Sequence, residues 1–354
     1  MENRRLVLAT DAWMPQINGV VRTLQKTIAV LNERNIDVTV VEPSAFRTIA
    51  CPLYPEIRLA FPAPYRIAKT IDSVRPHYIH IATEGPIGLQ VRRYCRKPSV
   101  PFTTSFHTRF PEYVEHLAHI PQWMIWPLVR WFHAPARAVM TPSNSMVETL
   151  TEKNFRRVTL WGRGINTELF RPLPRNYPAE HRPILMYVGR VSREKNVEAF
   201  LRLTDLPGTK YVVGDGPHRA GLERQYPDVR FLGYKTGFDL AEAYANADVL
   251  VFPSLTDTFG NVQLEALATG TPVAAFPAPG PRDVLIDPAY GCCHEDLRTA
   301  VLNALEHGNR ERAAEYARSF TWDAATDQFQ SNLTPILQPE SSEPSVIPRA
   351  HSVD

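Results

Sequence analysis

Cysteine is scarce in this chain, which has four among its 354 residues, at positions 51, 95, 292 and 293. No pair has the Cys-X-X-Cys spacing of a metal site or a redox motif, and the adjacent Cys292 and Cys293 make a poor disulfide pair. Structural disulfides belong to proteins of oxidising compartments. The cysteine pattern therefore predicts reduced thiols in a cytoplasmic protein.

Long hydrophobic runs and an excess of one charge are also lacking. No apolar run reaches the roughly 18 residues that span a bilayer, and no signal peptide is recognisable before the first predicted strand. We therefore expect any membrane contact to be peripheral. The 39 basic and 37 acidic residues leave a net charge of +2, which creates no strong field to attract nucleic acid. We expect no nucleic-acid partner.

The chain does have enough hydrophobic residues, 44% of the total, for the packed cores of two domains. Four prolines between Arg171 and Pro183 predict a linker. We therefore divide the chain into an N-terminal domain over 1–172 and a C-terminal domain over 173–318. A terminal helix over 319–333 is expected to pack back on the first domain, and residues 334–354, rich in Pro, Ser and Glu, to form a disordered tail.

One strand–loop–helix unit of the second domain carries the clearest signal. Asp248–Pro253 is predicted to be a buried parallel strand, and a helix is predicted from about Phe259 to Ala268, with Thr258 as its N-cap. The N–H groups at a helix N-terminus favour a phosphate, and Gly260 lets a ligand approach the backbone closely.

Two carboxylates flank this predicted helix N-terminus. Asp257 precedes the first turn, and Glu265 lies nearly two turns further on. Carboxylates accept hydrogen bonds from vicinal sugar hydroxyls, so a diphosphate on the helix end would have one acid near each end of the ligand. This arrangement fits a nucleotide-diphospho-sugar. The alternative is an ordinary αβ unit with solvated acids.

Three other loops carry candidate ligand-binding residues. Arg190 and Lys195 follow a predicted strand and suit a diphosphate, unless they are only a solvated basic loop. The dipeptide Asn18-Gly19 lies at the carboxyl edge of the first predicted sheet, where α/β folds bind ligands, although Asn-Gly is also a common turn. His107 follows another strand and is placed to orient a sugar hydroxyl, although a lone histidine is more often packed.

The segment 120–132 is rich in aromatic residues. Trp123, Trp126 and Trp131, with Arg130, suit a helix that lies in a membrane interface. The alternative is a core helix that is kinked or interrupted by Pro127.

The spacing from Asp257 to Glu265, with seven residues between them around Phe259-Gly260, resembles the signature of family 4 glycosyltransferases, which are retaining enzymes of the GT-B fold. The family has glutamate at the first position, where this chain has aspartate. The segment Gly189-Arg190, four residues and then Lys195-Asn196 is similar to a second motif of that family. The segment Thr-Asp-Thr-Phe-Gly-Asn-Val resembles the corresponding segment of a subgroup that contains lipid mannosyltransferases and sulfoquinovosyl-diacylglycerol synthases. The resemblance covers roughly residues 4 to 330.

The resemblance implies an α/β protein with two Rossmann-like αβα domains that face each other across a cleft. It also implies that Asp257 contacts the transferred sugar, that Glu265 contacts the ribose, and that no metal or cofactor is needed. The implied catalytic residues are His107, Arg190, Lys195 and Asp257. The implied donor contacts are Gly19, Arg190, Lys195, Asp257, Phe259, Gly260, Asn261, Val262 and Glu265. The acceptor-side candidates are Asn18, Arg109 and Tyr113.

The expected activity is transfer of a sugar from a UDP- or GDP-linked donor to a hydroxyl group. The subgroup resemblance and the aromatic segment favour a membrane lipid such as diacylglycerol or a glycolipid as acceptor, with peripheral contact to the anionic inner face of the cell membrane. Two alternatives stay open: a soluble or polysaccharide acceptor, and a non-catalytic nucleotide-sugar-binding partner protein. A dinucleotide-dependent oxidoreductase is disfavoured, because no Gly-X-Gly-X-X-Gly follows the first predicted strand.

Overall fold

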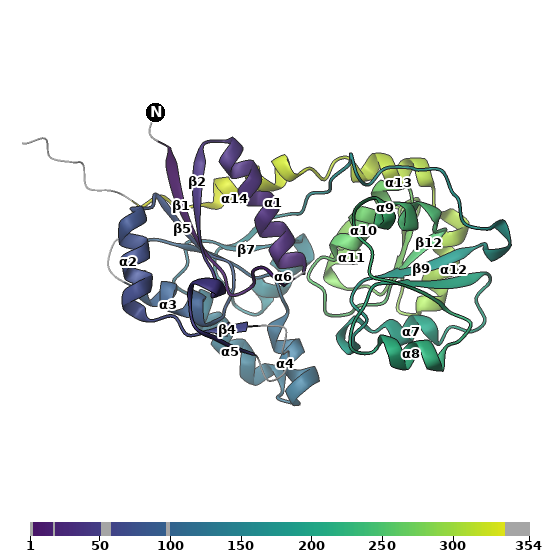
Figure 1. Ribbon diagram of the computed structural model, residues 1–354, viewed down its shortest axis with the longest axis horizontal. Helices are drawn as coiled ribbons and strands as arrows, with labels where there is room; N and C mark the ends of the chain where they lie inside the picture. Colours follow the sequence, from purple (N-terminus) through teal and green to yellow (C-terminus); the bar gives the residue numbers. More distant parts are fainter. Residues whose placement is uncertain (1–2, 17, 51–57, 97–99, 337–354) are drawn as a thin grey trace, which may run out of the picture.

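The computed structural model describes residues 3–16, 18–50, 58–96 and 100–336, without the side chains of Tyr113 and residues 116–118. The chain forms two lobes, one coloured purple to blue and the other green (Figure 1). Each lobe contains a parallel sheet of six strands, which confirms the expected α/β class with two Rossmann-like domains. Within the described ranges, no helix is both long enough and apolar enough to cross a membrane.

The first sheet has the strand order β2-β1-β5-β6-β7-β8. Its strands are β1 (Arg4–Ala9), β2 (Ile36–Val41), β5 (Tyr78–Ile81), β6 (Thr103–Ser105), β7 (Val139–Thr141) and β8 (Val158–Leu160). The helices of this lobe are α1 (Gly19–Glu33), α2 (Pro64–Val74), α3 (Pro86–Tyr94), α4 (Phe110–Ala118), α5 (Gln122–His133) and α6 (Asn144–Glu152). A short antiparallel pair, β3 (Thr48–Ala50) with β4 (Arg58–Ala60), stands beside the main sheet.

Alternation of side chains along β1 shows why this sheet is covered on both faces. Leu6 and Leu8 point into one core, together with Leu24 and Leu31 of α1. Their neighbours Val7 and Ala9 point into the other core, which contains side chains from α2, α3, α5 and α6. Because successive side chains of a strand face opposite ways, a strand that is apolar throughout needs helices on both sides.

The second sheet has the strand order β11-β10-β9-β12-β13-β14. Its strands are β9 (Ile184–Val188), β10 (Thr209–Val213), β11 (Arg230–Gly233), β12 (Val249–Phe252), β13 (Val273–Ala275) and β14 (Gly291–Cys293). The helices that follow the linker are α7 (Val197–Leu201), α8 (Arg219–Gln225), α9 (Gly237–Asn246), α10 (Asn261–Ala268), α11 (Pro279–Val284), α12 (Leu297–His307), α13 (Arg310–Ala317) and α14 (Trp322–Asn332).

After α13 the chain returns from the second lobe to the first, where the last helix, α14, lies beside α1 (Figure 1). Arg34, which follows α1, forms salt bridges with Asp323 at 3.1 Å and Asp327 at 2.6 Å. The ring of Phe329 packs on Trp161 with 4.6 Å between the centroids. Beyond this helix, Ile336 N donates to a carbonyl of the first lobe at 2.8 Å. The rest of the predicted tail, from 337 on, lies outside the described residues.

Candidate active site

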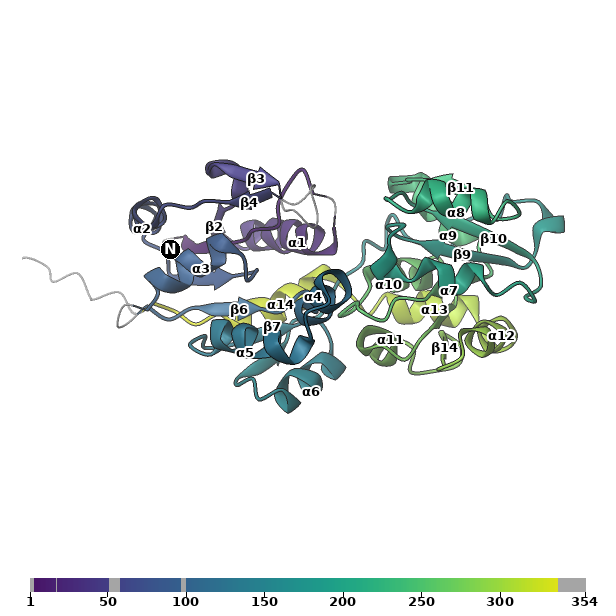
Figure 2. The same ribbon diagram turned by 90° about the horizontal axis from the view of Figure 1, so that it is seen from below.

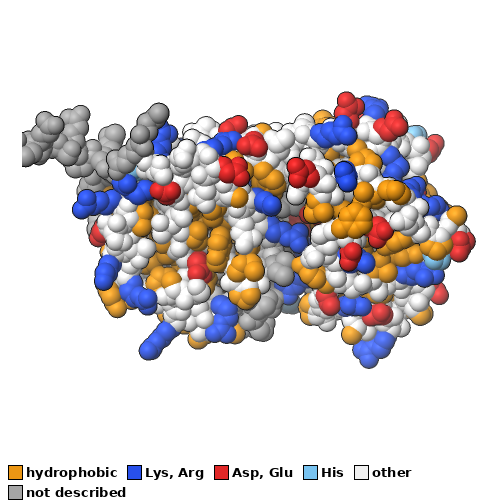
Figure 3. Space-filling model, turned by 45° about the horizontal axis from the view of Figure 1, so that its top comes forward, with side chains coloured by type: hydrophobic (Ala, Val, Ile, Leu, Met, Phe, Trp, Pro, Cys, Tyr) orange, Lys and Arg blue, Asp and Glu red, His pale blue; other side chains and the backbone are white. Residues whose placement is uncertain are grey.

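The two lobes meet through the loops at the carboxyl ends of their parallel strands, where α/β folds bind ligands. Arg109 Nη1 donates to Leu255 O at 2.9 Å, and Thr258 Oγ1 donates to His107 O at 2.8 Å. In the view from below, α4 of the first lobe faces α10 of the second (Figure 2). The surface is hollowed between the lobes, and Lys and Arg side chains lie in the hollow (Figure 3).

The basic loop after β9 is tied to the loop after β12 by three contacts. Asn196 Nδ2 donates to Pro253 O at 3.2 Å, and Thr256 Oγ1 donates to Glu194 O at 3.2 Å. Between them, Lys195 Nζ lies 2.6 Å from Asp257 Oδ1. The structure thus brings together the two charged residues that the sequence had placed in separate motifs.

Lys195 and Asp257 are both partly exposed, at 23% and 18% of their side-chain surfaces. A ligand can therefore reach the pair from the cleft. Arg190 lies two residues after β9 and is half-buried, and its carbonyl accepts a hydrogen bond from the Tyr187 hydroxyl at 2.7 Å. The two predicted phosphate ligands therefore come from one short loop at the carboxyl end of the second sheet.

The helix α10 begins at Asn261, two residues later than the sequence predicted. The prediction of Thr258 as its N-cap was wrong, because this hydroxyl donates to His107 O in the other lobe. Gly260 is the residue before the helix, and its φ of +84° lies in the left-handed region. A Cβ at this position would lie 2.5 Å from Phe252 Cζ. Glycine is therefore required here by both backbone conformation and close packing.

Among the other predicted donor residues, Phe259 and Val262 pack in the core of the second lobe. Asn261 is the first residue of α10 and faces the first lobe, since its Nδ2 would lie 3.8 Å from a Cβ built on Gly19. Asn18 is the N-cap of α1 and accepts from Val21 N at 3.0 Å. The Asn18-Gly19 loop therefore lies across the interface from the start of α10.

Glu265 lies on α10 and is almost completely buried. Its Oε2 accepts a hydrogen bond from the Tyr244 hydroxyl at 2.8 Å, and its Oε1 lies 3.5 Å from Arg22 Nη1 of α1. Burial raises the pKa of the Glu265 carboxyl, while the Tyr244 hydrogen bond and the Arg22 charge lower it. Burial also raises the pKa of Tyr244 well above its ordinary value, so this phenol stays protonated and acts as a donor.

His107 is buried where β6 turns toward α4. Arg163 Nη2 lies 3.0 Å from its Nδ1. Because arginine only donates, Nδ1 must be the unprotonated nitrogen, and Nε2 carries the hydrogen. Nε2 is buried, and no described residue is its hydrogen-bond partner. Burial, and next the positive charge of Arg163, hold the pKa of His107 well below its ordinary value, so the site offers a neutral N–H donor.

The two remaining acceptor-side candidates lie close to this histidine in sequence. Arg109 forms a salt bridge with Glu112 at 2.8 Å, and its bond to Leu255 joins it to the second lobe. Tyr113 belongs to α4, but its side chain lies outside the described residues. Arg109 is thus positioned between the lobes, next to the loop that carries Asp257.

Sequence reasoning missed three residues of this site: Arg22, Arg163 and Tyr244. A signal existed for the two arginines. Arg22 lies one helical turn after Gly19, and Arg163 stands between two glycines in Gly162-Arg163-Gly164. Tyr244 had no signal, because its partner Glu265 lies 21 positions away on another helix.

Two family models match the two lobes. The first, described as Glycosyltransferase Family 4, matches residues 17–169, and the second, described as Glycosyl transferases group 1, matches residues 182–307. A sucrose-phosphate synthase from Thermosynechococcus elongatus has the same fold, with a TM-score of 0.76 and 20% sequence identity over 93% of this chain and 98% of that one. Two Rossmann-like domains of this kind define the GT-B class of glycosyltransferases.

Comparison with three relatives indicates the family to which the chain belongs. A GDP-mannose-dependent alpha-mannosyltransferase of Mycolicibacterium smegmatis is 30% identical, over 94% of this chain and 98% of its own length. Sulfoquinovosyl transferase SQD2 of Arabidopsis thaliana is 28% identical, over 89% and 70%. Alpha-monoglucosyldiacylglycerol synthase of Streptococcus pneumoniae is 28% identical, over 85% and 78%. The chain belongs to the GT-B glycosyltransferases of family 4, in the subgroup that contains these enzymes.

Proposed function

We propose that this glycosyltransferase moves a sugar, with retention of its anomeric configuration, from a UDP- or GDP-linked donor to a hydroxyl of a membrane lipid such as diacylglycerol or a glycolipid. The observation that carries the proposal is the Lys195–Asp257 pair beside the N-terminus of α10. One relative is named for diacylglycerol and another for GDP-mannose, and these names support the choice of lipid and donor.

The donor would lie between the lobes, with its diphosphate on Arg190, Lys195 and the start of α10, and its ribose on Glu265. In the transfer step the acceptor oxygen forms a bond to the anomeric carbon as the bond from that carbon to the phosphate oxygen breaks. The acceptor proton passes to the departing phosphate oxygen on the same face. The positive charges and helix N-terminus stabilise the negative charge that develops on the diphosphate.

His107 and Asp257 would hold the transferred sugar. The Nε2–H of His107 is a buried donor with no acceptor in the described part of the chain, and a sugar hydroxyl oxygen would supply one. Asp257 accepts from sugar hydroxyls while its other contact holds Lys195. We propose that the reaction needs no metal ion, because Arg190 and Lys195 supply positive charge to the diphosphate.

The helix α5 supports peripheral contact with an anionic membrane. Trp126 is buried, whereas the side chains of Trp123 and Trp131 are 71% and 48% exposed. Met124 and Leu128 are exposed on the same outward side. The structure therefore combines the two interpretations of the aromatic segment: one side of the helix is core, and the other presents apolar side chains suited to a lipid interface.

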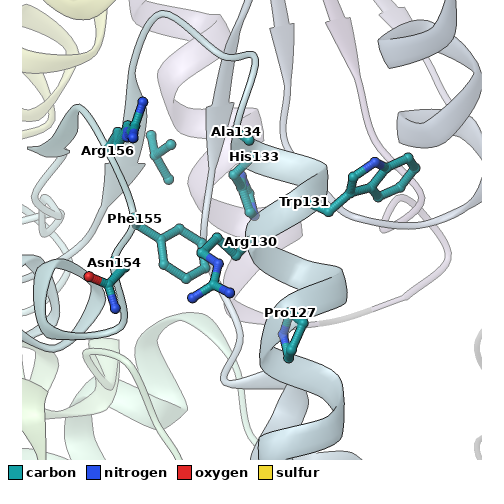
Figure 4. A pocket seen from close by; sticks show the side chains of 9 residues that line it. Pro127, Arg130, Trp131, His133, Ala134, Asn154, Phe155 and Arg156 are labelled. Atoms are coloured by element: carbon teal, nitrogen blue, oxygen red, sulfur yellow. The ribbon is translucent and has the colours of Figure 1, made fainter.

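Cations and a cavity border this outward side. A cavity of about 490 Å³ lies between α5 and the residues after α6, and Pro127, Arg130, Phe155 and Arg156 are among its lining residues. Arg130 and Phe155 lie on one side of the helix, and the Trp131 ring points to the other (Figure 4). We place a lipid phosphate beside Arg130 and Arg156, which would hold the protein on the inner face of the cell membrane.

The test is a panel of UDP-, GDP- and ADP-sugars with a membrane lipid extract, followed by assignment of the anomeric configuration of the product. We expect one donor to label the lipid phase with retention. Label in a soluble saccharide, or inversion, would contradict the corresponding part of the proposal. Donor binding without turnover on any acceptor would make the chain a nucleotide-sugar-binding partner protein. Vesicle sedimentation with and without phosphatidylglycerol tests the membrane contact separately.

A further inference from the structure

Arg22 joins the first lobe to the helix that begins at the candidate donor site. It lies on α1, one turn after the Asn18-Gly19 loop, and its Nη1 is 3.5 Å from Glu265 Oε1 on α10. The arginine side chain is 43% exposed, whereas that of Glu265 is 8% exposed. A cation that is open to the cleft thus approaches a carboxylate that is mostly buried but keeps a small exposed surface.

The surroundings of Glu265 make this cation important for its charge. Tyr244 of α9 donates to the other carboxylate oxygen but carries no charge itself. From α13, Arg310 is directed at the carbonyls of Ala245, Ala247 and Thr269. From α11, Asp283 bonds to Ser145 of the first lobe. Arg22 is therefore the cation, among the described residues, for which the structure gives a direct contact with Glu265.

The Glu265 carboxylate keeps unused hydrogen-bond acceptor positions. A carboxylate has about four acceptor positions on its two oxygens. The Tyr244 hydroxyl occupies one on Oε2, and Arg22 approaches Oε1. Positions therefore remain on both oxygens, as a vicinal diol requires. Arg22 fixes the orientation of the group without using up its acceptor capacity.

We propose that Arg22 is a positioning residue for donor binding: when the lobes close, it holds Glu265 ionised and oriented to accept the two ribose hydroxyls. The inference rests on the proposed ribose role of Glu265. It adds that the N-terminal domain takes part in nucleotide recognition through a charge, so that nucleotide affinity is coupled to closure of the cleft.

This coupling predicts that nucleotide affinity depends on pH. Burial raises the pKa of Glu265, and Arg22 opposes that rise. Without Arg22 the carboxyl would keep its proton to a higher pH, and a protonated carboxyl accepts fewer hydrogen bonds. Nucleotide affinity is therefore expected to fall on acidification in every form of the protein that keeps Glu265. The fall should begin at a higher pH when Arg22 is absent.

The experiment is calorimetric titration of the full chain with UDP and GDP from about pH 5.5 to 8.5, a range that extends well above the ordinary carboxyl pKa. For the nucleotide that binds, Arg22→Gln is expected to weaken affinity about tenfold at neutral pH, within the usual range of coupling between sites, and to move the acidic loss upward. Arg22→Lys should keep most of the affinity and most of the pH profile of the unmodified protein. Lys26→Gln removes the same charge from an exposed position on α1 and should match the unmodified protein.

Two outcomes separate this inference from the proposed function. If Glu265→Gln binds nucleotide as tightly as the unmodified protein, the ribose assignment fails, and with it the role of Arg22. If Glu265→Gln weakens binding while Arg22→Gln matches Lys26→Gln in affinity and pH profile, the Arg22 inference alone is overturned. A thermal melt identifies a variant that does not fold. If Arg22→Gln does not fold, Arg22→Lys provides the test instead. An Arg22→Lys protein that loses nucleotide affinity, with the pH at which affinity falls unchanged, would contradict the charge role.

Discussion

Lys195 and Asp257 form a salt bridge of 2.6 Å between the two loops that the second sheet presents to the first lobe. In the proposed function, this one contact joins the cation that binds the donor phosphates to the carboxylate that binds the sugar. Each group therefore holds the other in position before a donor arrives. Such preorganisation lowers the cost of ordering these side chains when the diphosphate binds.

Replacing Lys195 by alanine should reduce kcat at least about tenfold, because the proposed mechanism uses this charge to stabilise the leaving diphosphate. Steady-state transfer rates measure the effect. Arg193 lies in the same loop, is exposed, and makes a matched control as Arg193→Ala. A Lys195→Ala enzyme with a near-normal kcat would refute the role of this ammonium group.

Asp257→Glu restores the residue that the family has at this position. We expect kcat/KM to stay within about threefold, which corresponds to less than about 1 kcal/mol, since one added methylene moves the carboxylate only slightly. Asp257→Ala should lose far more, because the sugar and Lys195 both lose their acceptor. Equal activity of the two variants would show that neither contact of this carboxylate contributes to the transfer.

The sequence was enough to predict which residues share a loop within each motif, because these residues are close along the chain. Arg190 and Lys195 share one loop, and Asp257 and Gly260 share another, so turn chemistry and helix polarity were enough. The contacts between motifs were not predictable. Arg22 and Glu265 lie on helices of different lobes, and His107 receives its tautomer from Arg163. The hydroxyl of Thr258 looked like a helix cap, but the first lobe supplies a competing acceptor for it.

Gly260→Ala tests the backbone geometry that begins α10. The added Cβ would collide with Phe252, and φ is +84°, so we expect the free energy of unfolding to fall by about 1–3 kcal/mol. Urea denaturation measures this change. Gly221 lies in α8 with no atom near its virtual Cβ, and Gly221→Ala should instead raise stability by about 0.4–1 kcal/mol. Equal effects at both sites would contradict the strain argument.

The aromatic helix α5 gives opposite expectations for two of its tryptophans. Trp126→Ala should lower the free energy of unfolding by about 3–5 kcal/mol, because a buried ring is deleted. Trp123→Ala should leave stability nearly unchanged and reduce sedimentation with anionic vesicles. The membrane role of this surface fails if Trp123→Ala binds vesicles as well as the unmodified protein does.

His107 should remain neutral from about pH 8 down to 5.5, across the range where an ordinary histidine titrates. Its pKa is lowered in the folded state, so the unfolded chain binds the extra proton first as the pH falls through about 6.5. This histidine therefore contributes a loss of stability below that pH. Ring-proton NMR shifts that titrate near the ordinary value would show that the burial of this ring beside Arg163 does not hold in solution.

The most direct measurement is the initial rate at which a labelled sugar passes from its nucleotide to the lipid phase, compared between the unmodified protein and the Lys195→Ala variant. The account predicts label in the lipid phase for the unmodified protein and at least about tenfold less for the variant. Label that stays in the aqueous phase with every donor, or that reaches the lipid equally fast with the variant, would contradict it.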